Sequence, residues 1–496
     1  MRSVGPQLLF SEQLHATKYR EEGEDFRACV DRQAAALKDT DEHFHKLRDI
    51  YGDMRFMNGG RVQAAVGSTK IVTAYNCFVS GTIADSFVDG PNSIAQMTVE
   101  AATTMRMGGG IGYDFSTLRP SGDRIAGVDS TTDGPIAFMP VFNAWCKATS
   151  SSGNRRGAQM AVLRIDHPDI ETFIRCKQSQ GALGGFNISV GVTDEFMNCL
   201  KTGERFPLTF KGKVYRYVDP EALWEMLMRS TWDWAEPGVL FIDTINRMNN
   251  LWYCEDIAAT NPCGEQPLPP YGACLLGSFN VTRYITPAAS GYSFNWSQLR
   301  EDVAPVVRAL DNVIDRTRYP LDKQADEAKN KRRMGSGTTG MANAIEACGY
   351  EYGTTGYLNM QTRILEIIRD EAYRASVELA KEKGAFPLYD DRYLQSLFVK
   401  TLPEDIQEGI ALHGIRNSHL TSIAPTGTIS FCMDYVSSGV EPVIGIPDES
   451  FQMHYEGTRK VNMPHGQVKV QGSDYGFREF GVKGVMAQDV SAQQHV

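Results

Sequence analysis

The sequence predicts an α/β fold, in the form of an α/β barrel rather than a helical bundle, and the alternation of its predicted strands and helices carries this prediction. Residues 159–245 alternate short apolar strands with helices, as in residues 186–190 followed by residues 222–231. This alternation is typical of βα units, in which helices pack against a sheet. Residues 258–280 contain four prolines and several glycines, a composition that excludes a helix and predicts a stiff loop.

Length, charge and cysteine content limit the class of protein. A chain of 496 residues can bury a substantial core. Its net charge of −10 and pI of about 5.5 argue against non-specific binding to nucleic acid or to an anionic membrane. No apolar stretch approaches the length of a membrane span, and the first ten residues lack the apolar core of a signal peptide. We therefore expect a cytoplasmic protein whose ten cysteines are kept reduced.

The first part of the chain predicts helices. Residues 11–53 are polar and helix-prone, and apolar side chains recur at helical spacing at Phe26, Cys29, Val30, Ala34 and Leu37. His43 and His45 would face apart on such a helix, so we expect no metal site there. We place a boundary after this segment, with residues 1–55 as an N-terminal helical segment and residues 56–496 as the barrel.

Glycine patterns mark two later segments. Residues 85–107 predict a helix that ends in a glycine-rich stretch at 108–112, where the backbone must turn sharply or approach another segment closely. Residues 335–340 contain the G-x-G-x-x-G pattern of dinucleotide-binding loops. The residues before it are basic and polar instead of an apolar strand, so we assign no cofactor to this pattern. Residues 299–315 predict a strongly amphipathic helix.

The loop of residues 258–280 carries side chains suited to catalysis. If its tip is extended, Asn261, Cys263 and Glu265 point to one face. A thiol beside an amide and a carboxylate offers a one-electron or nucleophilic sulfur, a hydrogen-bonding group and a base. Cys274 opens an apolar run that predicts a strand returning to the same place. A structural loop, a disulfide and a zinc site are the alternatives, although no paired C-x-x-C flanks either cysteine.

Three other segments carry groups that could bind a ligand or take part in a reaction. Residues 422–430 predict a strand and a tight turn with hydroxyl and N–H groups, which suits a phosphate if a helix begins nearby. Residues 150–158 hold glycine and two arginines that suit an anionic nucleotide, or form an ordinary exposed basic loop. Residues 74–79 predict a buried strand containing Cys77, which on sequence alone is a small hydrophobic residue.

Asn-Pro-Cys-Gly-Glu at 261–265, followed by Cys-Leu-Leu-Gly-Ser-Phe-Asn at 274–280, resembles the finger loop and adjoining strand of the ribonucleotide reductase catalytic subunit. The long intervening form, Gln-Pro-Leu-Pro-Pro-Tyr-Gly-Ala, is most similar to the adenosylcobalamin-dependent (class II) branch. The resemblance implies a ten-stranded α/β barrel of two antiparallel-related halves with the loop through its centre. It also implies thiyl-radical reduction of ribonucleotides, expected to be diphosphates, to 2′-deoxyribonucleotides for DNA synthesis. Residues 335–340 would be structural glycines where a loop enters a helix.

The resemblance also implies roles for individual residues. Cys263 would carry the radical, Glu265 and Asn261 would act on the ribose 3′-OH, and Cys77 with Cys274 would form the reducing dithiol. The residues expected to bind substrate are Asn76, Pro425, Thr426, Gly427, Thr428 and Ser430. Those expected to bind a dNTP effector, in or near the specificity loops at 123–134 and 150–158, are Asp85, Arg119, Asn154, Arg155 and Arg156. No metal site is expected.

The expected cofactor is adenosylcobalamin, and the expected reductant is thioredoxin or a similar protein. The family continues beyond a segment like residues 481–484 into further barrel strands and a cysteine-bearing tail. We therefore expect a split gene, whose second polypeptide supplies those strands, or a truncated product; a homodimer is one assembly the family allows, and no ATP cone is expected. The alternatives are a class I large subunit that receives its radical from a metal-containing subunit, and a nucleotide-binding fragment that is inactive without its complementing chain.

Overall fold

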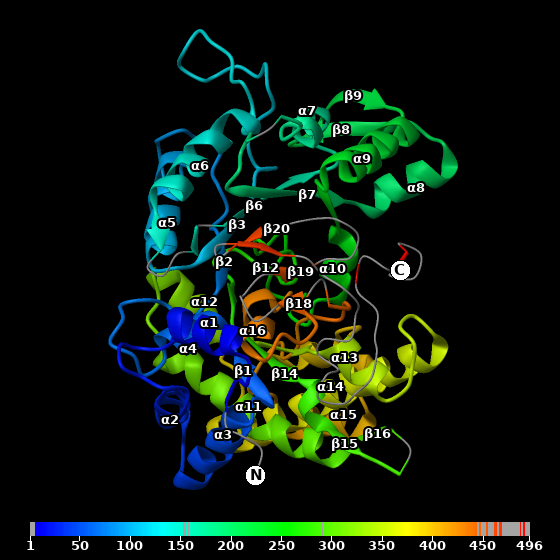
Figure 1. Cartoon of the computed structure of the whole chain (residues 1–496). Helices are drawn as coiled ribbons and strands as arrows, with labels where there is room; N and C mark the ends of the chain where they lie inside the picture. Colours follow the sequence, from blue (N-terminus) through cyan, green and yellow to red (C-terminus); the bar gives the residue numbers. More distant parts are fainter. Residues whose placement is uncertain are drawn as a thin grey trace.

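The structure, a computed structural model, describes most of the chain. It covers residues 5–151, 155–156, 158–179, 181–289 and 291–443, together with 446–447, 453–454, 461–463, 466–468, 487 and 490–491. The fold is mixed α/β, with two sheets side by side and helices on both sides of them (Figure 1). The α/β class predicted from the sequence is therefore confirmed.

The larger sheet has six strands in the order β10-β7-β6-β3-β2-β13. Their bounds are β2 (Cys77–Val79), β3 (Gly110–Asp114), β6 (Gln159–Arg164), β7 (Phe186–Val192), β10 (Gly238–Phe241) and β13 (Ala273–Cys274). Strands β2, β3, β6, β7 and β10 are mutually parallel, whereas β13 runs antiparallel to β2. Parallel neighbours need crossover connections, and the predicted alternation of strands and helices supplies them.

The smaller sheet contains β1 (Phe56–Asn58), β14 (Leu276–Asn280) and β17 (Gly335–Thr339), with β14 in the centre. β1 is antiparallel to β14 and β17 is parallel to it. Only Leu275 separates β13 from β14, and its carbonyl accepts a hydrogen bond from Gly335 N at 2.7 Å. One nearly continuous extended segment, residues 273–280, therefore joins the two sheets.

The remaining strands pair two by two: β4 (Ser150–Ser151) with β5 (Arg155–Arg156), β8 (Phe206–Phe210) with β9 (Lys213–Val218), β11 (Ala259–Thr260) with β12 (Pro267–Leu268), β15 (Ile285–Pro287) with β16 (Tyr292–Phe294), β18 (Ile446–Pro447) with β19 (Met453–His454), and β20 (Val461–Met463) with β21 (Gly466–Val468). The hairpin of β11 and β12 holds the predicted loop.

Most helices pack in two groups, and in Figure 1 the upper group lies above and beside the larger sheet, whereas α2, α3, α11, α14 and α15 lie below the smaller one. The upper group is α5 (Ile94–Arg106), α6 (Met139–Ala148), α7 (Ile170–Arg175), α8 (Asp194–Thr202) and α9 (Pro220–Trp234). The others are α1 (Leu9–Tyr19), α2 (Phe26–Leu37), α3 (Asp41–Gly52), α4 (Gly60–Ala65), α10 (Ile242–Met248), α11 (Trp296–Arg316), α12 (Asp322–Lys331), α13 (Met341–Ala347), α14 (Thr355–Lys383), α15 (Glu404–His413) and α16 (Gly427–Cys432).

Each group of helices has its own hydrophobic core. In the lower one, α11 buries an apolar stripe at helical spacing, made of Leu299, Val303, Val306, Val307, Leu310, Val313 and Ile314. The upper core lies between α5–α9 and strands β3, β6 and β7. A third, small cluster lies between them and includes Cys77, Cys274 and Leu276. The two predicted reducing cysteines thus sit where the two sheets meet.

Two helix boundaries differ from the prediction. The helix predicted at residues 85–107 begins only at Ile94, where the Ser93 hydroxyl accepts from Gln96 N at 3.4 Å. Asn92, just before this cap, has φ +61°, a left-handed conformation that an α-helix cannot contain. The helix predicted at 299–315 extends by a few residues, to Trp296–Arg316.

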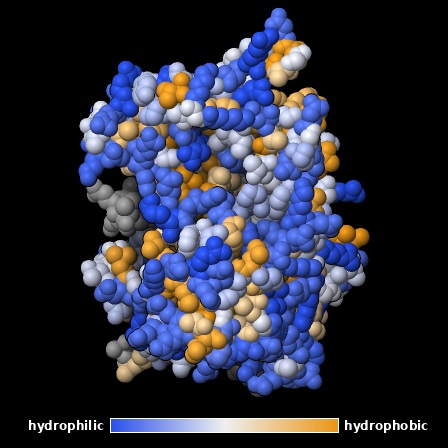
Figure 2. All heavy atoms as spheres, turned by 180° about the vertical axis from the view of Figure 1, so that it is seen from behind, coloured by the Kyte–Doolittle hydropathy of each residue, from blue (hydrophilic) through white to orange (hydrophobic). Residues whose placement is uncertain are grey.

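The surface view in Figure 2 is largely hydrophilic, with hydrophobic patches of limited size. Among the helices of the described ranges, none is both long and apolar enough to span a lipid bilayer.

Candidate active site

The tip of the β11–β12 hairpin is a turn. Gly264 N donates to Asn261 O at 3.0 Å, and Gly264 has φ +85°, a conformation that favours glycine. The tip is therefore not extended, so the condition under which Asn261, Cys263 and Glu265 would share one face is not met, because the chain reverses between Asn261 and Gly264. Cys263 is exposed at the end of the turn and Glu265 is half-buried beside it, whereas Asn261 is fully buried behind them.

Hydrogen bonds hold this turn in place. Asn261 N donates to Gln266 O at 3.2 Å, and Asn261 Oδ1 accepts from Gln266 N at 2.9 Å. From β7, Asn187 Nδ2 donates to Pro262 O at 2.7 Å, which ties the tip to the larger sheet. Cys263 is thus carried by a backbone that is fixed on both sides.

Glycines in β3 let the hairpin approach the sheet. A Cβ on Gly112 would lie 1.8 Å from Thr260 O, and one on Gly110 would lie 2.9 Å from Pro262 Cγ. No side chain fits at the first of these positions, because the neighbour is backbone. Residues 108–112 were expected to turn sharply or to approach another segment closely, and Gly110 and Gly112 make such an approach to the hairpin.

Cys77 and Cys274 occupy directly opposed positions in antiparallel β2 and β13. Opposed residues have Cβ atoms about 4.5–5.5 Å apart, so a small adjustment allows a disulfide. Both side chains are buried, at 3% and 0% exposure, and neither is joined in a disulfide. Burial raises the pKa of the Cys274 thiol well above its ordinary value, and the nearby Cys77, Glu265 and Cys263 add to the effect. Cys274 is therefore a protonated thiol at neutral pH.

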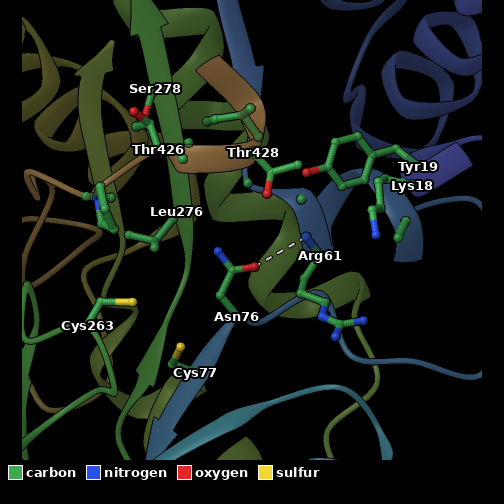
Figure 3. Close-up of a pocket in the computed structure, with 18 of the residues that line it drawn as sticks. Lys18, Tyr19, Arg61, Asn76, Cys77, Cys263, Leu276, Ser278, Thr426 and Thr428 are labelled. Carbon is green, nitrogen blue, oxygen red and sulfur yellow. Dashed lines mark hydrogen bonds between the residues drawn. The ribbon is translucent and has the colours of Figure 1, made fainter. Parts of the chain in front are cut away.

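A cavity of about 570 Å³ opens beside Cys77 of this pair. One end is lined by Asn76, Cys77, Cys263 and Glu265, and Figure 3 shows the sulfur atoms of both cysteines directed into it. Asn76 Oδ1 accepts from the backbone N of Arg61 at 3.2 Å, which orients its amide at the cavity wall. Two chain segments far apart in sequence thus bring two thiols, a carboxylate and an amide into one space.

The other end of the cavity is formed by the turn before α16. Pro425, Thr426, Gly427 and Thr428 line it, and α16 begins at Gly427, so the helix required by the phosphate prediction is present. Thr426 has φ +51°, and its hydroxyl accepts from Gly439 N at 2.9 Å. Ser430 does not line the cavity, because it is buried within α16 and its hydroxyl donates to Gly427 O at 3.0 Å.

Residues 75–447 match the family model described as "Ribonucleotide reductase, barrel domain". The chain belongs to this family. A vitamin B12-dependent ribonucleoside-diphosphate reductase of Mycobacterium tuberculosis is 38% identical over 373 residues, which cover 74% of this chain and 51% of the relative. A protein of the same name from Thermoplasma acidophilum is 33% identical over 407 residues, covering 82% and 50%.

A more distant relative, the ribonucleoside-diphosphate reductase subunit alpha of Chlamydia pneumoniae, is 25% identical over 428 residues, covering 74% of this chain and 40% of the relative. This chain spans about half the length of the B12-dependent relatives that it matches.

Sequence reasoning missed several residues of the cavity of this reductase-family chain. Thr17, Lys18 and Tyr19 reach it from the end of α1, Arg61 from α4, and Ser278 from β14. These residues carry no motif of their own, because tertiary packing alone brings the end of α1 over the site. Of these, Ser278 lay in the strand quoted at 274–280 and Arg61 lay just after the predicted boundary at residue 56, but neither was assigned to the site.

The predicted effector residues Asp85 and Arg119 bind each other. Arg119 Nε lies 3.0 Å from Asp85 Oδ1, and Lys211 Nζ lies 3.0 Å from the other carboxylate oxygen. Partial burial alone would raise the pKa of Asp85, but the hydrogen bonds from Arg119 and Lys211 outweigh it and lower that pKa. Arg155 and Arg156 form β5, while their side chains and all of Asn154 lie outside the described residues.

The G-x-G-x-x-G segment is a buried strand, β17, that leads into α13. It was expected to be a loop, and the difference follows from its pairing with β14. A Cβ on Gly337 would lie 2.2 Å from Ser422 O, and Gly340 has φ +73° at the start of α13. The glycines therefore permit close packing of backbone, in line with their interpretation as structural.

The search for metal ligands covers the described residues only. Within them, no three or more His, Cys, Asp or Glu side chains are grouped so that they could hold a metal ion.

Proposed function

We propose that this chain forms the catalytic barrel of a ribonucleotide reductase, which reduces ribonucleoside diphosphates to 2′-deoxyribonucleotides by thiyl-radical chemistry. The observation that carries the proposal is the position of Cys77, which lies opposite Cys274 in the sheet and lines a cavity that Cys263 and Glu265 also line. The names of the B12-dependent diphosphate reductases that it resembles support the substrate class and favour this reading over a class I large subunit. Because the reaction needs reduced thiols, we place the protein in the cytoplasm.

Adenosylcobalamin is the proposed cofactor, and the site fits it in one respect. The Cys263 thiol is exposed at the tip of a fixed turn, so a bound group can reach it. The cavity itself has the size of a nucleotide and not of a corrin ring, so we assign none of its residues to the corrin. When bound, this cofactor supplies the one-electron chemistry that generates a radical on the sulfur.

Each residue of the site then has its own step in the proposed reaction. The Cys263 sulfur removes the 3′-hydrogen of the ribose and later returns it, while Glu265 takes the 3′-OH proton. Asn261 Oδ1 is engaged by Gln266 N, so an orienting role rests on Asn261 Nδ2, which has no hydrogen-bond partner among the described residues. Cys77 protonates the 2′-OH, which leaves as water. Cys77 and Cys274 together give two electrons and two protons and become a disulfide.

The turn before α16 is the proposed diphosphate site. Pro425, Thr426, Gly427 and Thr428 would contact the phosphates through backbone N–H and hydroxyl groups, with Asn76 on the ribose. A Cβ on Gly427 would meet nothing within 4 Å, so a ligand can approach this backbone closely. We do not extend the role to Ser430 by direct contact; its hydroxyl supports the turn by donating to Gly427 O.

The finer architecture is part of the proposal. We propose that β1, β2, β3, β6, β7, β10, β14 and β17 belong to a ten-stranded barrel of two antiparallel-related halves, with the β11–β12 hairpin inside. We retain residues 1–55 as the N-terminal helical segment and residues 56–496 as the barrel. A dNTP effector would bind near Asp85 and Arg119, with residues 154–156 relaying its identity to the active site.

Three partners are proposed. Thioredoxin or a similar protein would re-reduce the disulfide, and a second polypeptide bearing the additional length of the relatives stays a prediction. A second copy of the chain is the proposed partner of α5 and α6, where Val99, Val141 and Trp145 are exposed on neighbouring helices.

A single-turnover experiment tests the function. The chain, alone and with the expected second polypeptide, receives CDP and adenosylcobalamin without oxygen or external reductant. We expect one dCDP per active site, with Cys77 joined to Cys274 in the alkylated peptide map. Formation of dCDP while both thiols remain alkylatable would refute the reducing pair. Turnover only with a metal-containing subunit would instead support the class I alternative.

A further inference from the structure

The end of α1 forms one wall of the cavity, on the side of the proposed phosphate site. Figure 3 shows Lys18 and Tyr19 on the same side as Thr428, with the Tyr19 phenol directed toward Thr428. This wall comes from residues that precede the range matched by the family model, which begins at residue 75. The match to the barrel domain therefore assigns no role to it.

The wall is held rigidly. Tyr19 packs on the start of α4, where a Cβ on Gly60 would lie 2.8 Å from Tyr19 Cε1. One turn earlier, His15 Nε2 lies 3.0 Å from Gln63 Oε1 of α4, and its Nδ1 accepts from Arg20 Nε at 3.0 Å. Because buried contacts lie on both sides of Lys18, its backbone has a fixed position at the cavity.

Positive charge gathers at this wall, although the whole chain carries a net charge of −10. Lys18 is half-buried and forms no ion pair or hydrogen bond with any residue in the described part of the chain. Lys70 also lines the cavity, and its Nζ donates to Arg20 O at 3.3 Å, beside the end of α1. The cavity's carboxylate, Glu265, belongs to the hairpin with Cys263.

A half-buried lysine that is not engaged within the described part of the chain can donate to an anionic ligand group at the edge of this cavity. Arg61 cannot serve in the same way, since its guanidinium packs against Gly108, where a Cβ would lie 2.6 Å from Arg61 Cζ. Lys18 is therefore the cation best placed for a ligand group that extends from the turn before α16.

We propose that Lys18 binds the terminal phosphate of the nucleotide and makes the site select a diphosphate over a monophosphate. The inference rests on the proposed function, because it assumes that the turn before α16 holds the first phosphate. A charge-assisted contact of this kind changes affinity by about tenfold to a hundredfold. Lys70, which already donates to Arg20 O, would add a longer-range attraction only.

Equilibrium dialysis of the full chain with CDP and with CMP measures the selection directly. The variants are Lys18→Ala, Lys18→Arg and, as matched control, Lys201→Ala, which removes a last-turn lysine from α8 instead of α1. We expect CDP to bind the unchanged chain at least tenfold more tightly than CMP. Lys18→Ala should lower CDP affinity at least tenfold while CMP affinity changes less than threefold. Lys18→Arg and Lys201→Ala should keep the preference.

The outcomes separate this inference from the function beneath it. If the unchanged chain binds CDP no more tightly than CMP, or if Lys18→Ala lowers the affinity for both nucleotides equally, Lys18 does not bind the second phosphate. Either outcome leaves the reductase proposal intact. If the unchanged chain binds neither nucleotide, both proposals fail together. Thermal unfolding of each variant shows whether a lost affinity reflects a lost fold.

Discussion

Cys263 and Cys274 have the same functional group but opposite surroundings, and their chemistry should differ accordingly. Cys263 is exposed at the tip of a turn, whereas Cys274 is fully buried and its thiol pKa is raised. An accessible sulfur can gain and lose a hydrogen atom at a substrate, while a buried protonated thiol is suited to storing electrons with a neighbouring cysteine.

Replacing Cys263 by serine tests the first of these roles. Serine has nearly the same shape, but its O–H bond is too strong to yield the radical, so deoxynucleotide formation should fall below detection while CDP affinity stays within about threefold. Cys254→Ser, at another exposed cysteine, is the matched control and should retain activity. Measurable turnover by Cys263→Ser in the single-turnover assay would exclude Cys263 as the radical site.

His15 should make the protein sensitive to acid. Burial, followed by the charge of Arg20, lowers its pKa from 6.5 to about 4, and at 1% exposure it is neutral in the fold. The unfolded chain therefore binds its proton at a higher pH than the folded chain does. Stability is full above pH 6.5 and decreases as the pH falls toward 4, by about 2–3 kcal/mol at pH 4.5.

Urea unfolding between pH 7.5 and 4.5 measures this contribution. His15→Gln, which cannot titrate, should show a smaller decrease in the free energy of unfolding over this range. His45→Gln is the control, because His45 is exposed on α3. Equal pH dependence in all three proteins would mean that His15 titrates normally in the fold.

For individual residues, the sequence could indicate the members of the site that belong to a local sequence pattern. The Asn-Pro-Cys-Gly-Glu stretch pointed to Cys263 and Glu265, and both line the cavity. Lys18 and Tyr19 could not be predicted, because they lie in the last turn of an ordinary helix and reach the cavity only through contacts of α1 with α4 and α16. Residues that reach a site only through tertiary packing have no local sequence pattern by which they could be predicted.

At the scale of elements, the hairpin depends on the strand beneath it. A methyl group on Gly112 would overlap Thr260 O, and backbone cannot move aside without shifting the turn that carries Cys263. Gly112→Ala should therefore lower stability by about 1–3 kcal/mol and reduce deoxynucleotide formation as well.

The matched variant lies on β7 of the same sheet. A Cβ on Gly191 would lie 3.7 Å from Val162 Cγ1, an ordinary contact, so Gly191→Ala should be tolerated in both respects. Urea unfolding and the single-turnover assay would be run on both proteins. A Gly112→Ala protein as stable and active as Gly191→Ala would show that the hairpin does not need this close approach.

Element types were predictable where periodicity was strong, as in α2 and α11, whose apolar positions are buried as expected. The turn at the hairpin tip was not predictable, because the alternation of side chains along a strand does not indicate where a glycine will reverse the chain. The start of α5 was also missed, since the left-handed Asn92 that precedes it follows from tertiary structure.

At the scale of the whole molecule, the exposed apolar side chains on α5 and α6 indicate a surface through which two copies of the chain could form a dimer. Val99 is 60% exposed and Trp145 42%, and a second copy of the chain would cover them. Val99→Asp should convert the proposed dimer into a monomer in analytical ultracentrifugation. Leu412→Asp, at a 76% exposed apolar residue on α15, should leave the assembly unchanged. A monomeric unchanged chain would remove the basis for this dimer.

The pairing of β2 with β13 joins residues about 200 positions apart, and β1 pairs with β14 over a similar distance. A ribosome adds roughly 5–20 residues each second, so Cys77 is made about 10–40 seconds before Cys274 exists. Until then, one edge of β2 has no strand beside it and relies on β3 for its pairing. The parallel scaffold is therefore assembled first, and the two sulfur atoms that store the electrons meet only late in the synthesis of the barrel.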